Sequence, residues 1–530
     1  MNTHVPPPAR IVSAREVAAQ IDSGGEIAFI DVREEGQYGL LHPLLVVNLP
    51  YSRLELDIGR LVPRKRVPVV LVDDGDGVGA RAQQRLDALG YSDVRVLDGG
   101  AAAWRETGRP LFEGENVPSK AFAEVVEHSF GTPHISAAEL KARVESGDRL
   151  VVIDNRTVEE FERFHVPGAV NAPGVDLVHR ISDLIPSDDT FVVVSCAGRT
   201  RGIMGAQSLI SAGIPNRVAA LEGGTQGWRL AGFELERGAR ASGAPSDAAR
   251  QAGQARAARL VAEHGLPILS QSELAAWQAD ESRTTYVFDV RAPSEYAEGH
   301  AEGARSAPGG QLLQKLDTQV AVRGARLVLA DDDGVRATIT AYWLKQLGWE
   351  VAILDPAAPR TSRQEPAAAP AVPQVNAVPV DQALAWLGSG AIVSVTSSAT
   401  YRAAQPAGAV WSIRPRLPAT AATLGAPARL LVVGEEDGVA ALAAAELAEI
   451  TDAEVAVLAG GLAAWTQAGL PVAASPDIPA DAERIDFLFW NENRHNGNAA
   501  HSRAYLYWEL QLPGQIEQDG SAGYRLTPAR

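Results

Sequence analysis

Runs of apolar, mostly β-branched residues recur along the chain, and a helix-like pattern follows each of them. They lie at residues 27–32, 67–72, 150–154 and 191–194. Such a run, without alternating polar positions, is typical of a parallel strand that is covered on both faces. Because the strands alternate with helices, the pattern predicts α/β domains, each with a mainly parallel sheet and helices on both faces.

Two short motifs show that the chain is built from repeats. Gly-Gly-x-x-x-Trp begins at Gly99, Gly223 and Gly460, and a strand ending in Asp-x-Arg ends at Arg33, Arg156 and Arg291. The spacing is that of whole domains, so we expect duplicated domains and not a solenoid. The predicted segments are repeat 1 (10–112), repeat 2 (132–237), repeat 3 (264–356), repeat 4 (377–475) and a C-terminal segment (476–530).

Repeat 2 contains the only cysteine of the 530 residues, Cys196, where the apolar run 191–194 stops. Glycines follow it, and residues 203–210 have a helix pattern. Unpaired N–H groups at a helix start favour an anion, so we expect the pKa of the thiol to be lowered. Arg199 and Arg201 add positive charge. The loop therefore predicts a site for an anionic sulfur and an anionic substrate, with Cys196 as nucleophile and substrate contacts from Ala197, Gly198, Arg199, Thr200, Arg201 and Gly202.

The other repeats lack this cysteine. Alignment places Asp73, Asp331 and Gly434 at the position of Cys196 in repeats 1, 3 and 4. A nucleophilic aspartate is the alternative for the first two, which we do not favour. We therefore predict that repeats 1, 3 and 4 are catalytically inactive.

The run Cys196-Ala-Gly-Arg-Thr-Arg201 resembles the active-site loop of rhodaneses, the thiosulfate sulfurtransferases. The resemblance implies four tandem rhodanese-like α/β/α domains. It also implies that sulfur moves from thiosulfate or a similar small anionic donor, through a persulfide on Cys196, to a thiophilic acceptor such as cyanide or a cellular thiol. Rhodaneses need no metal or organic cofactor, so none is expected here.

The resemblance also places Asp154 and Arg156 at the rim of the active-site face. The alternative for both residues is a structural role, which we favour because Asp-x-Arg also occurs in repeats without a cysteine. The spacing of Arg156 and Glu160 predicts a local salt bridge. His165 could protonate a leaving group, but His300 holds a similar place in repeat 3, so a structural role is again favoured.

Two other classes of function stay open. One is a cysteine phosphatase or arsenate reductase of the same fold. Against it, only four residues separate Cys196 from Arg201, whereas those phosphatases have five. The other is a non-catalytic binding scaffold, which the three repeats without a cysteine favour and the intact loop of repeat 2 opposes.

The C-terminal segment has a density of aromatic residues that the repeats lack. The plain interpretation is a helix whose aromatic side chains pack against one domain. The alternative is that the segment covers the Cys196 pocket, with Arg494 or His495 contacting the substrate.

The amino-acid composition limits the classes of partner that the chain can bind. The formal net charge is −17, which argues against nucleic acid or an anionic membrane as partner. No apolar run resembles a membrane span, and the first residues lack the pattern of a signal peptide, so the cytoplasm is the expected location. The sequence leaves open whether the protein forms a homodimer.

Residues 237–256 are rich in Gly, Ala and Ser and predict a flexible connector.

Overall fold

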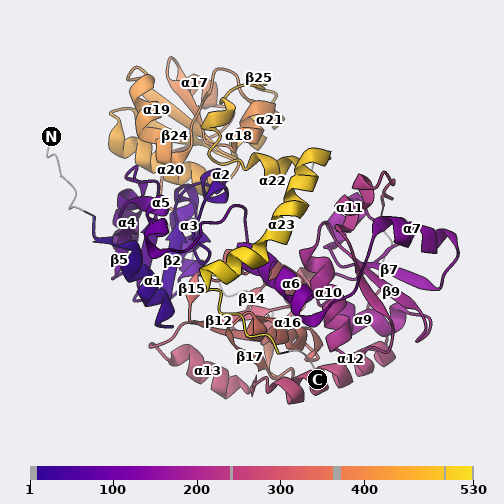
Figure 1. Cartoon of the computed structure of the whole chain (residues 1–530). Coiled ribbons are helices and arrows are strands. Elements are labelled where there is room, and N and C mark those ends of the chain that lie inside the picture. The colour runs from indigo at the N-terminus through magenta and orange to yellow at the C-terminus, as the bar shows by residue number, and fades with distance from the viewer. Residues whose placement is uncertain (1–8, 239–242, 362–371, 495–496, 528–530) are drawn as a thin grey trace. The chain divides into compact units, whose positions relative to one another are not determined.

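The computed structural model describes residues 9–238, 243–361, 372–494 and 497–527 (Figure 1). The chain divides into two compact units. The first contains repeats 1 and 4 and the start of the C-terminal segment, and the second contains repeats 2 and 3 together with the rest of that segment. Their residues are 1–20, 27–114 and 366–492 for the first unit, and 21–26, 115–365 and 493–530 for the second.

In the first unit, each repeat contributes five parallel strands to its sheet, in the same order. Numbered within the repeat, that order is first, fifth, fourth, second, third. Repeat 1 pairs β1 (Ile11–Val12), β5 (Val94–Leu97), β4 (Val69–Val72), β2 (Ile27–Asp31) and β3 (Val47–Asn48). Repeat 4 pairs β19 (Ala377–Val378), β24 (Glu454–Leu458), β23 (Arg429–Val433), β20 (Ala391–Ser394) and β22 (Val410–Trp411).

The second unit repeats this order twice. Repeat 2 pairs β6 (His134–Ile135), β10 (Val218–Leu221), β9 (Phe191–Ser195), β7 (Leu150–Asp154) and β8 (Val170–Asn171), all parallel. Repeat 3 pairs β11 (Ile268–Leu269), β17 (Glu350–Leu354), β16 (Arg326–Ala330), β12 (Thr285–Asp289) and β14 (Arg305–Ser306). The expected fold class, tandem α/β/α domains with mainly parallel sheets, is confirmed.

Helices cover both faces of the repeat 2 sheet. On one face Leu140, Phe161 and Trp228 pack around Val193 in one hydrophobic cluster. On the other face Gly205 of the following helix approaches Val194. All five residues of β9 are buried in consequence, which explains their uninterrupted apolar run. The helices of repeat 2 are α7 (Ala137–Glu145), α8 (Val158–Arg163), α9 (Asp176–Leu184), α10 (Thr200–Ser211) and α11 (Gly224–Leu230).

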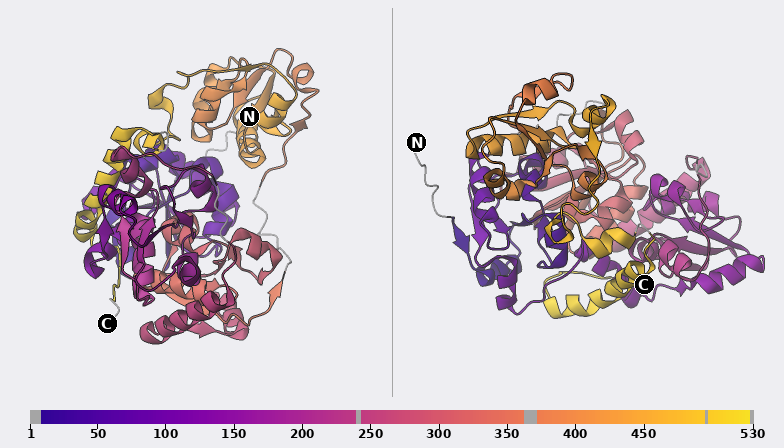
Figure 2. Two further views of the ribbon diagram at one scale, coloured as in Figure 1. Left: turned by 90° about the vertical axis from the view of Figure 1, so that its right-hand side faces the viewer. Right: turned by 90° about the horizontal axis from the view of Figure 1, so that it is seen from above.

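The other repeats carry helices at corresponding places, which Figure 2 shows from two further sides. Repeat 1 has α1 (Ala14–Asp22), α2 (Glu35–Leu40), α3 (Leu54–Leu61), α4 (Val78–Ala88) and α5 (Gly100–Ala103). Repeat 3 has α13 (Gln271–Ala279), α14 (Pro293–Glu298), α15 (Gly309–Gln314) and α16 (Val335–Gln346). Repeat 4 has α17 (Ala383–Leu387), α18 (Ser398–Ala403), α19 (Leu417–Thr423), α20 (Asp437–Ile450) and α21 (Gly461–Gln467).

Among the described residues, four α-helices lie outside the repeats. The expected flexible connector is wrong from residue 247 onward, because Ser246 caps the long helix that starts there. In the second unit the C-terminal helix α23 packs along α6 (Figure 1). The four helices are α6 (Val117–Phe130), α12 (Asp247–His264), α22 (Phe489–Asn493) and α23 (Ala499–Asp519).

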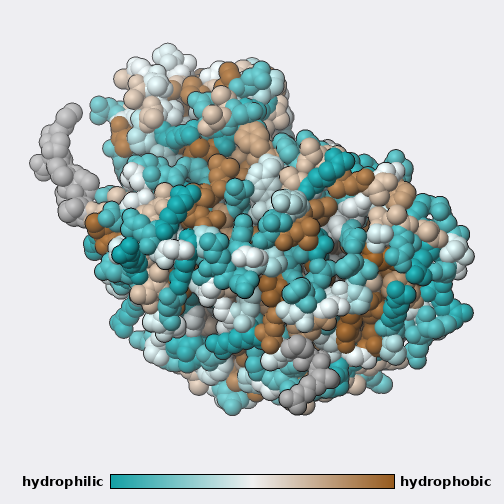
Figure 3. Space-filling view, viewed as in Figure 1, coloured by the Kyte–Doolittle hydropathy of each residue, from teal (hydrophilic) through white to brown (hydrophobic). Residues whose placement is uncertain are grey.

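The surface is that of a charged chain. The face drawn in Figure 3 is largely hydrophilic, with hydrophobic residues in scattered groups. Among the helices that the structure describes, none combines the length and hydropathy needed to cross a membrane.

Candidate functional site

Cys196 lies directly after β9, the central strand of the repeat 2 sheet, and four residues before the first turn of α10. Its side chain is buried, and the backbone N–H groups of Gly198 and Gly202 donate hydrogen bonds to its sulfur. The carboxyl end of a central parallel strand is where ligand sites of such sheets form. The loop therefore surrounds the sulfur with donors suited to an anion.

Repeats 1 and 3 use N–H groups of the corresponding loop to hold a carboxylate. Asp73 accepts from the N–H groups of Gly75 and Gly79, both at 2.9 Å. Asp331 accepts from Gly334 at 2.7 Å and from Ala337 at 2.9 Å. In these two repeats a built-in carboxylate occupies the place that the sulfur takes in repeat 2. We conclude that the loop is an anion cradle in all three.

The thiol itself does not match the expectation of a lowered pKa. Burial raises the pKa of Cys196, while the charge of Arg201 and the N–H groups of Gly202 and Gly198 act against this. The carboxylate of Glu509 raises the pKa further. The sequence showed the loop donors but gave no measure of how deeply the sulfur is buried, and desolvation of the thiolate is the larger effect.

Arg201 is held by a carboxylate from α8. Its guanidinium donates to both oxygens of Glu160, at 2.6 and 2.8 Å. Repeat 3 contains the same pair, since Arg336 donates to both oxygens of Glu295 at 2.8 and 3.0 Å. Arg201 is thereby fixed in orientation beside Cys196.

Arg199 is held by α6, outside repeat 2. It donates to both oxygens of Glu124 at 2.8 Å and also to Glu127. Burial raises the pKa of Glu124 to about 7, although the hydrogen bond and charge of Arg199 act in the opposite direction. Both loop arginines thus have carboxylate partners in this structure, so an anionic substrate would compete with these glutamates for them.

The Gly-Gly-x-x-x-Trp motif supports the loop from beneath. The N–H of Thr225 donates to the carbonyl of Cys196 at 2.8 Å, and a Cβ on Gly224 would lie 2.2 Å from that oxygen. Ala101 and Leu462 donate in the same way to Asp73 and Gly434. The second glycine is thus required by its close approach to the residue at the nucleophile position.

Asp154 and Arg156 form a buried pair in which Arg156 Nη2 lies 2.8 Å from Asp154 Oδ2. The expected salt bridge between Arg156 and Glu160 is wrong, because Asp154 binds the arginine and Arg201 binds the glutamate. Asp31 and Arg33 in repeat 1, like Asp289 and Arg291 in repeat 3, pair in the same way. Because the same aspartate–arginine pair recurs in repeats that lack the cysteine, a structural role for Asp154 and Arg156 is supported.

His165 also has a counterpart in a repeat that lacks the cysteine. Its Nδ1 donates to the carbonyl of Phe161 at 2.9 Å, and its ring stacks on the Phe161 ring. His300 makes the same contacts with Tyr296 in repeat 3. These contacts fix the imidazole against α8 and support the structural alternative.

The C-terminal helix contributes two side chains that sequence reasoning missed. Tyr505 and Glu509 lie against the loop at Gly198, and Thr200 donates to Glu509 at 3.0 Å. Tyr505 donates to the same carboxylate at 2.9 Å. Their spacing of four residues on one helix face was readable, but nothing in the sequence indicated which domain that face contacts. The alternative that the segment covers the loop thereby gains support.

A cavity of about 120 Å³ opens beside the loop in the second unit. Arg229 and Arg494 are its charged lining residues, and Arg494 also lies 3.5 Å from the centre of the Tyr505 ring. His495, the other residue considered in this segment, falls outside the described residues. The remaining lining residues are Phe164, Ala197, Thr225, Gln226, Leu230, Gly497, Ala499 and Ser502.

Fold and site together define a class: an α/β protein of repeated parallel-sheet domains, one of which holds a cysteine in an anion-binding loop. Residues 13–107, 136–231 and 270–357 match the family model of the rhodanese-like domain. The chain belongs to the rhodanese family. Repeat 4 is outside these matches, and its assignment to the family stays a prediction, which its strand order supports.

Several known proteins are similar to this chain. A crystal structure of thiosulfate sulfurtransferase from Pseudomonas aeruginosa is 41% identical, with a TM-score of 0.91, over 98% of this chain and 99% of that one. The putative thiosulfate sulfurtransferase SseB of Mycobacterium tuberculosis is 26% identical over 34% of this chain and 74% of its own length. A thiosulfate sulfurtransferase of Corynebacterium glutamicum is 26% identical over 36% of this chain and 79% of its own.

Proposed function

We propose that this protein is a sulfurtransferase in which Cys196 carries the transferred sulfur as a persulfide. One observation carries the proposal: the only cysteine of the chain occupies a cradle whose N–H donors hold carboxylates in repeats 1 and 3. A persulfide anion needs such donors, as does the thiolate that precedes it. The names of the similar proteins support the same activity and suggest thiosulfate as donor.

In the first step, the Cys196 thiolate attacks the outer sulfur of thiosulfate. A sulfur–sulfur bond forms on Cys196, the sulfur–sulfur bond of thiosulfate breaks, and sulfite leaves with the electron pair. In the second step, cyanide or a thiolate attacks the terminal sulfur, and the Cys196 thiolate leaves. No net oxidation occurs, since the sulfane sulfur passes unchanged from one nucleophile to another.

The loop residues have distinct roles in this proposal. The N–H groups of Gly198 and Gly202 hold the sulfur anion, and the peptide groups from Ala197 to Gly202 form the cradle. Arg201 offsets the charge on Cys196, and Arg199 contacts the anionic donor when Glu124 releases it. The cavity with Arg229 and Arg494 offers a route for small anions beside Ala197. Asp154, Arg156 and His165 support the loop without contacting substrate.

Repeats 1, 3 and 4 are inactive in this proposal, because Asp73, Asp331 and Gly434 replace the cysteine. The cytoplasm as location and a homodimer as assembly stay predictions. Among the described residues, no group of three or more His, Cys, Asp or Glu side chains is placed to hold a metal ion.

A steady-state assay of thiocyanate formation from thiosulfate and cyanide tests the activity. We expect turnover by the wild type and none by Cys196→Ser, which keeps the size of the side chain. Asp331→Asn is the matched control at the corresponding position of repeat 3, and its turnover should equal that of the wild type. Turnover by folded Cys196→Ser would contradict the proposal. Absence of turnover by the wild type, together with hydrolysis of a phosphate ester that depends on Cys196, would favour the phosphatase alternative.

A further inference from the structure

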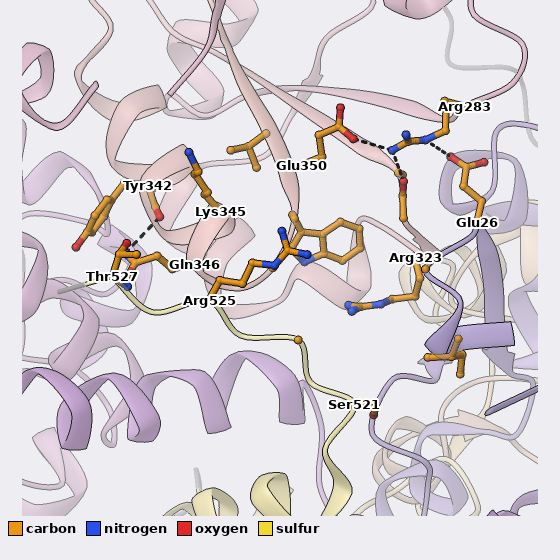
Figure 4. A pocket seen from close by; sticks show the side chains of 18 of the residues that line it. Glu26, Arg283, Arg323, Tyr342, Lys345, Gln346, Glu350, Ser521, Arg525 and Thr527 are labelled. Carbon is orange, nitrogen blue, oxygen red and sulfur yellow. Dashed lines mark hydrogen bonds and ion pairs between the residues drawn. The ribbon is translucent and has the colours of Figure 1, made fainter. Parts of the chain in front are cut away.

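A second and much larger cavity lies in the second compact unit, away from the Cys196 loop. Its volume is about 1620 Å³, and its lining comes mainly from repeat 3 and from the chain after α23 (Figure 4). No residue of repeat 2 lines it. Ligand cavities typically measure about 300 to 1,000 Å³, so there is room here for a molecule larger than thiosulfate.

The acidic side chains that face this cavity already have partners. Glu350 accepts from Arg283 at 2.8 Å, as the dashed line in Figure 4 shows. Glu26 accepts from the N–H of Thr284 at 2.6 Å. Glu263 accepts a hydrogen bond at 3.0 Å from Arg259, which lies one turn earlier on α12. Arg283 also lies 3.8 Å from Glu26, so one guanidinium partly offsets the charges of Glu26 and Glu350. Asp22 is the fourth acidic residue of the lining.

Three cationic side chains of the lining differ in this respect. Among the residues that the structure describes, Arg323, Lys345 and Arg525 have no carboxylate within ion-pair distance. The Lys345 ammonium donates instead to two backbone carbonyls, those of His264 at 2.6 Å and Gly265 at 3.2 Å.

Arg323 and Arg525 reach the cavity from two different segments. The Arg323 guanidinium lies 4.9 Å from the centre of the Trp349 ring. Burial lowers its pKa, and the negative charge of the buried Asp317 carboxylate acts against this. Arg525 belongs to the chain after α23, which two hydrogen bonds to Gln346 hold in place: Arg525 N–H at 2.7 Å and Thr527 N–H at 3.0 Å. Figure 4 shows the side chains of Arg323 and Arg525 among those that line the cavity.

We propose that this cavity binds a small molecule with several negative charges of the phosphate type. In a chain of net charge −17, Arg323, Lys345 and Arg525 line one cavity without a carboxylate at ion-pair distance, and their positive charges favour an anionic ligand. Phosphate oxygens accept the paired N–H donors of guanidinium groups, and a multiply charged ligand would supply the counter-charge. The site shares no residue with the Cys196 loop, so the proposal does not depend on the sulfurtransferase activity.

Isothermal titration of the full chain with pyrophosphate and with ATP, at ionic strength matched with sodium chloride, tests this inference. We expect saturable 1:1 binding, and at least tenfold weaker binding for Arg323→Gln and for Arg525→Gln. Arg503→Gln, an exposed arginine on α23, is the matched control and should bind as the wild type does. Arg525 is also exposed, so its variant should fold even if Arg323→Gln does not. Thermal melts confirm folding of each variant.

Two results would overturn the inference. One is the absence of saturable binding of either anion by the wild type. The other is binding that is equal in wild type, Arg525→Gln and Arg503→Gln, which would indicate non-specific attraction to surface charge. Retained binding by Cys196→Ser is expected, because this variant removes sulfur transfer and leaves the cavity intact.

Discussion

The hydroxyl of Thr200 donates a 3.0 Å hydrogen bond to Glu509, which joins the first residue of α10 to the C-terminal helix α23. Glu509 is almost fully buried, and its Oε2 has no hydrogen-bond partner among the described residues. A carboxylate at this position opposes a thiolate on Cys196. The C-terminal segment is thereby part of the electrostatic surroundings of the proposed nucleophile.

Replacing Glu509 by Gln should therefore lower the pKa of Cys196, because the amide keeps an oxygen for Thr200 and Tyr505 but carries no charge. The measurement is the pH profile of Cys196 alkylation by iodoacetamide. The midpoint should move to lower pH, and alkylation near neutral pH should become faster. Glu517→Gln, an exposed change on the same helix, should leave the profile in place. An unchanged profile for Glu509→Gln would refute this role.

Replacing Arg201 by Gln should have the opposite effect and raise the pKa of Cys196. It removes the positive charge that lowers the pKa of Cys196 and leaves Glu160 without its partner. Loss of one preorganised electrostatic group typically costs about 100-fold or more in rate. We expect a loss of that order in single-turnover sulfur loading, with the alkylation midpoint at higher pH. Arg336→Gln breaks the corresponding pair in repeat 3 and should leave loading unchanged.

The affinity for an anionic donor should depend on pH through Glu124. Because its pKa is raised to about 7, Glu124 takes up a proton as the pH falls through that value and loses its charge on Arg199. KM for thiosulfate should then decrease from about pH 8 to about pH 6. Glu124→Gln should show a low KM with little pH dependence, whereas the exposed Glu145→Gln should follow the wild type. A KM that rises over this range in the wild type would contradict the argument.

The same raised pKa has a consequence for stability. Since the pKa of Glu124 in the folded chain lies above its ordinary 4.5, the native state binds this proton more tightly than the unfolded state. The contribution of Glu124 to the free energy of unfolding is therefore largest below about pH 4.5 and declines as the pH rises to about 7. Denaturant titrations of wild type and Glu124→Gln over this range measure the difference.

Two glycines allow the packing beneath the loop to be tested in a matched pair. A Cβ would lie 2.2 Å from the Cys196 carbonyl in Gly224→Ala and 2.5 Å from the Asp73 carbonyl in Gly100→Ala. Each change should destabilise its repeat by about 1 to 3 kcal/mol, as overpacking does. Only Gly224→Ala should also reduce sulfur loading per folded molecule. Equal loading in both variants would show that the position of the loop carbonyl is not critical.

Much of the fold was predictable because local pattern determines it. The apolar run at β9 and the repeated Asp-x-Arg and Gly-Gly-x-x-x-Trp motifs all have the predicted structural counterparts. These features depend on residues close in sequence or on repetition. The alternation of strands and helices was enough to give the sheet class.

The surroundings of the loop were not predictable in the same way. Glu124 and Glu509 reach the Cys196 loop from helices outside repeat 2, and no sequence pattern links them to it. Burial of the sulfur likewise depends on tertiary packing, which is why the expected lowering of the thiol pKa was wrong. The motif defines the donors near the sulfur, whereas long-range contacts determine the balance of charge.

Intact mass measures directly whether Cys196 carries sulfur. We expect the reduced protein to gain the mass of one sulfur atom after thiosulfate, and cyanide to remove it as thiocyanate. Cys196→Ser should show no gain under the same conditions. A folded, reduced wild type that gains no sulfur from thiosulfate or from other sulfane donors, or a Cys196→Ser variant that gains it, would contradict the account.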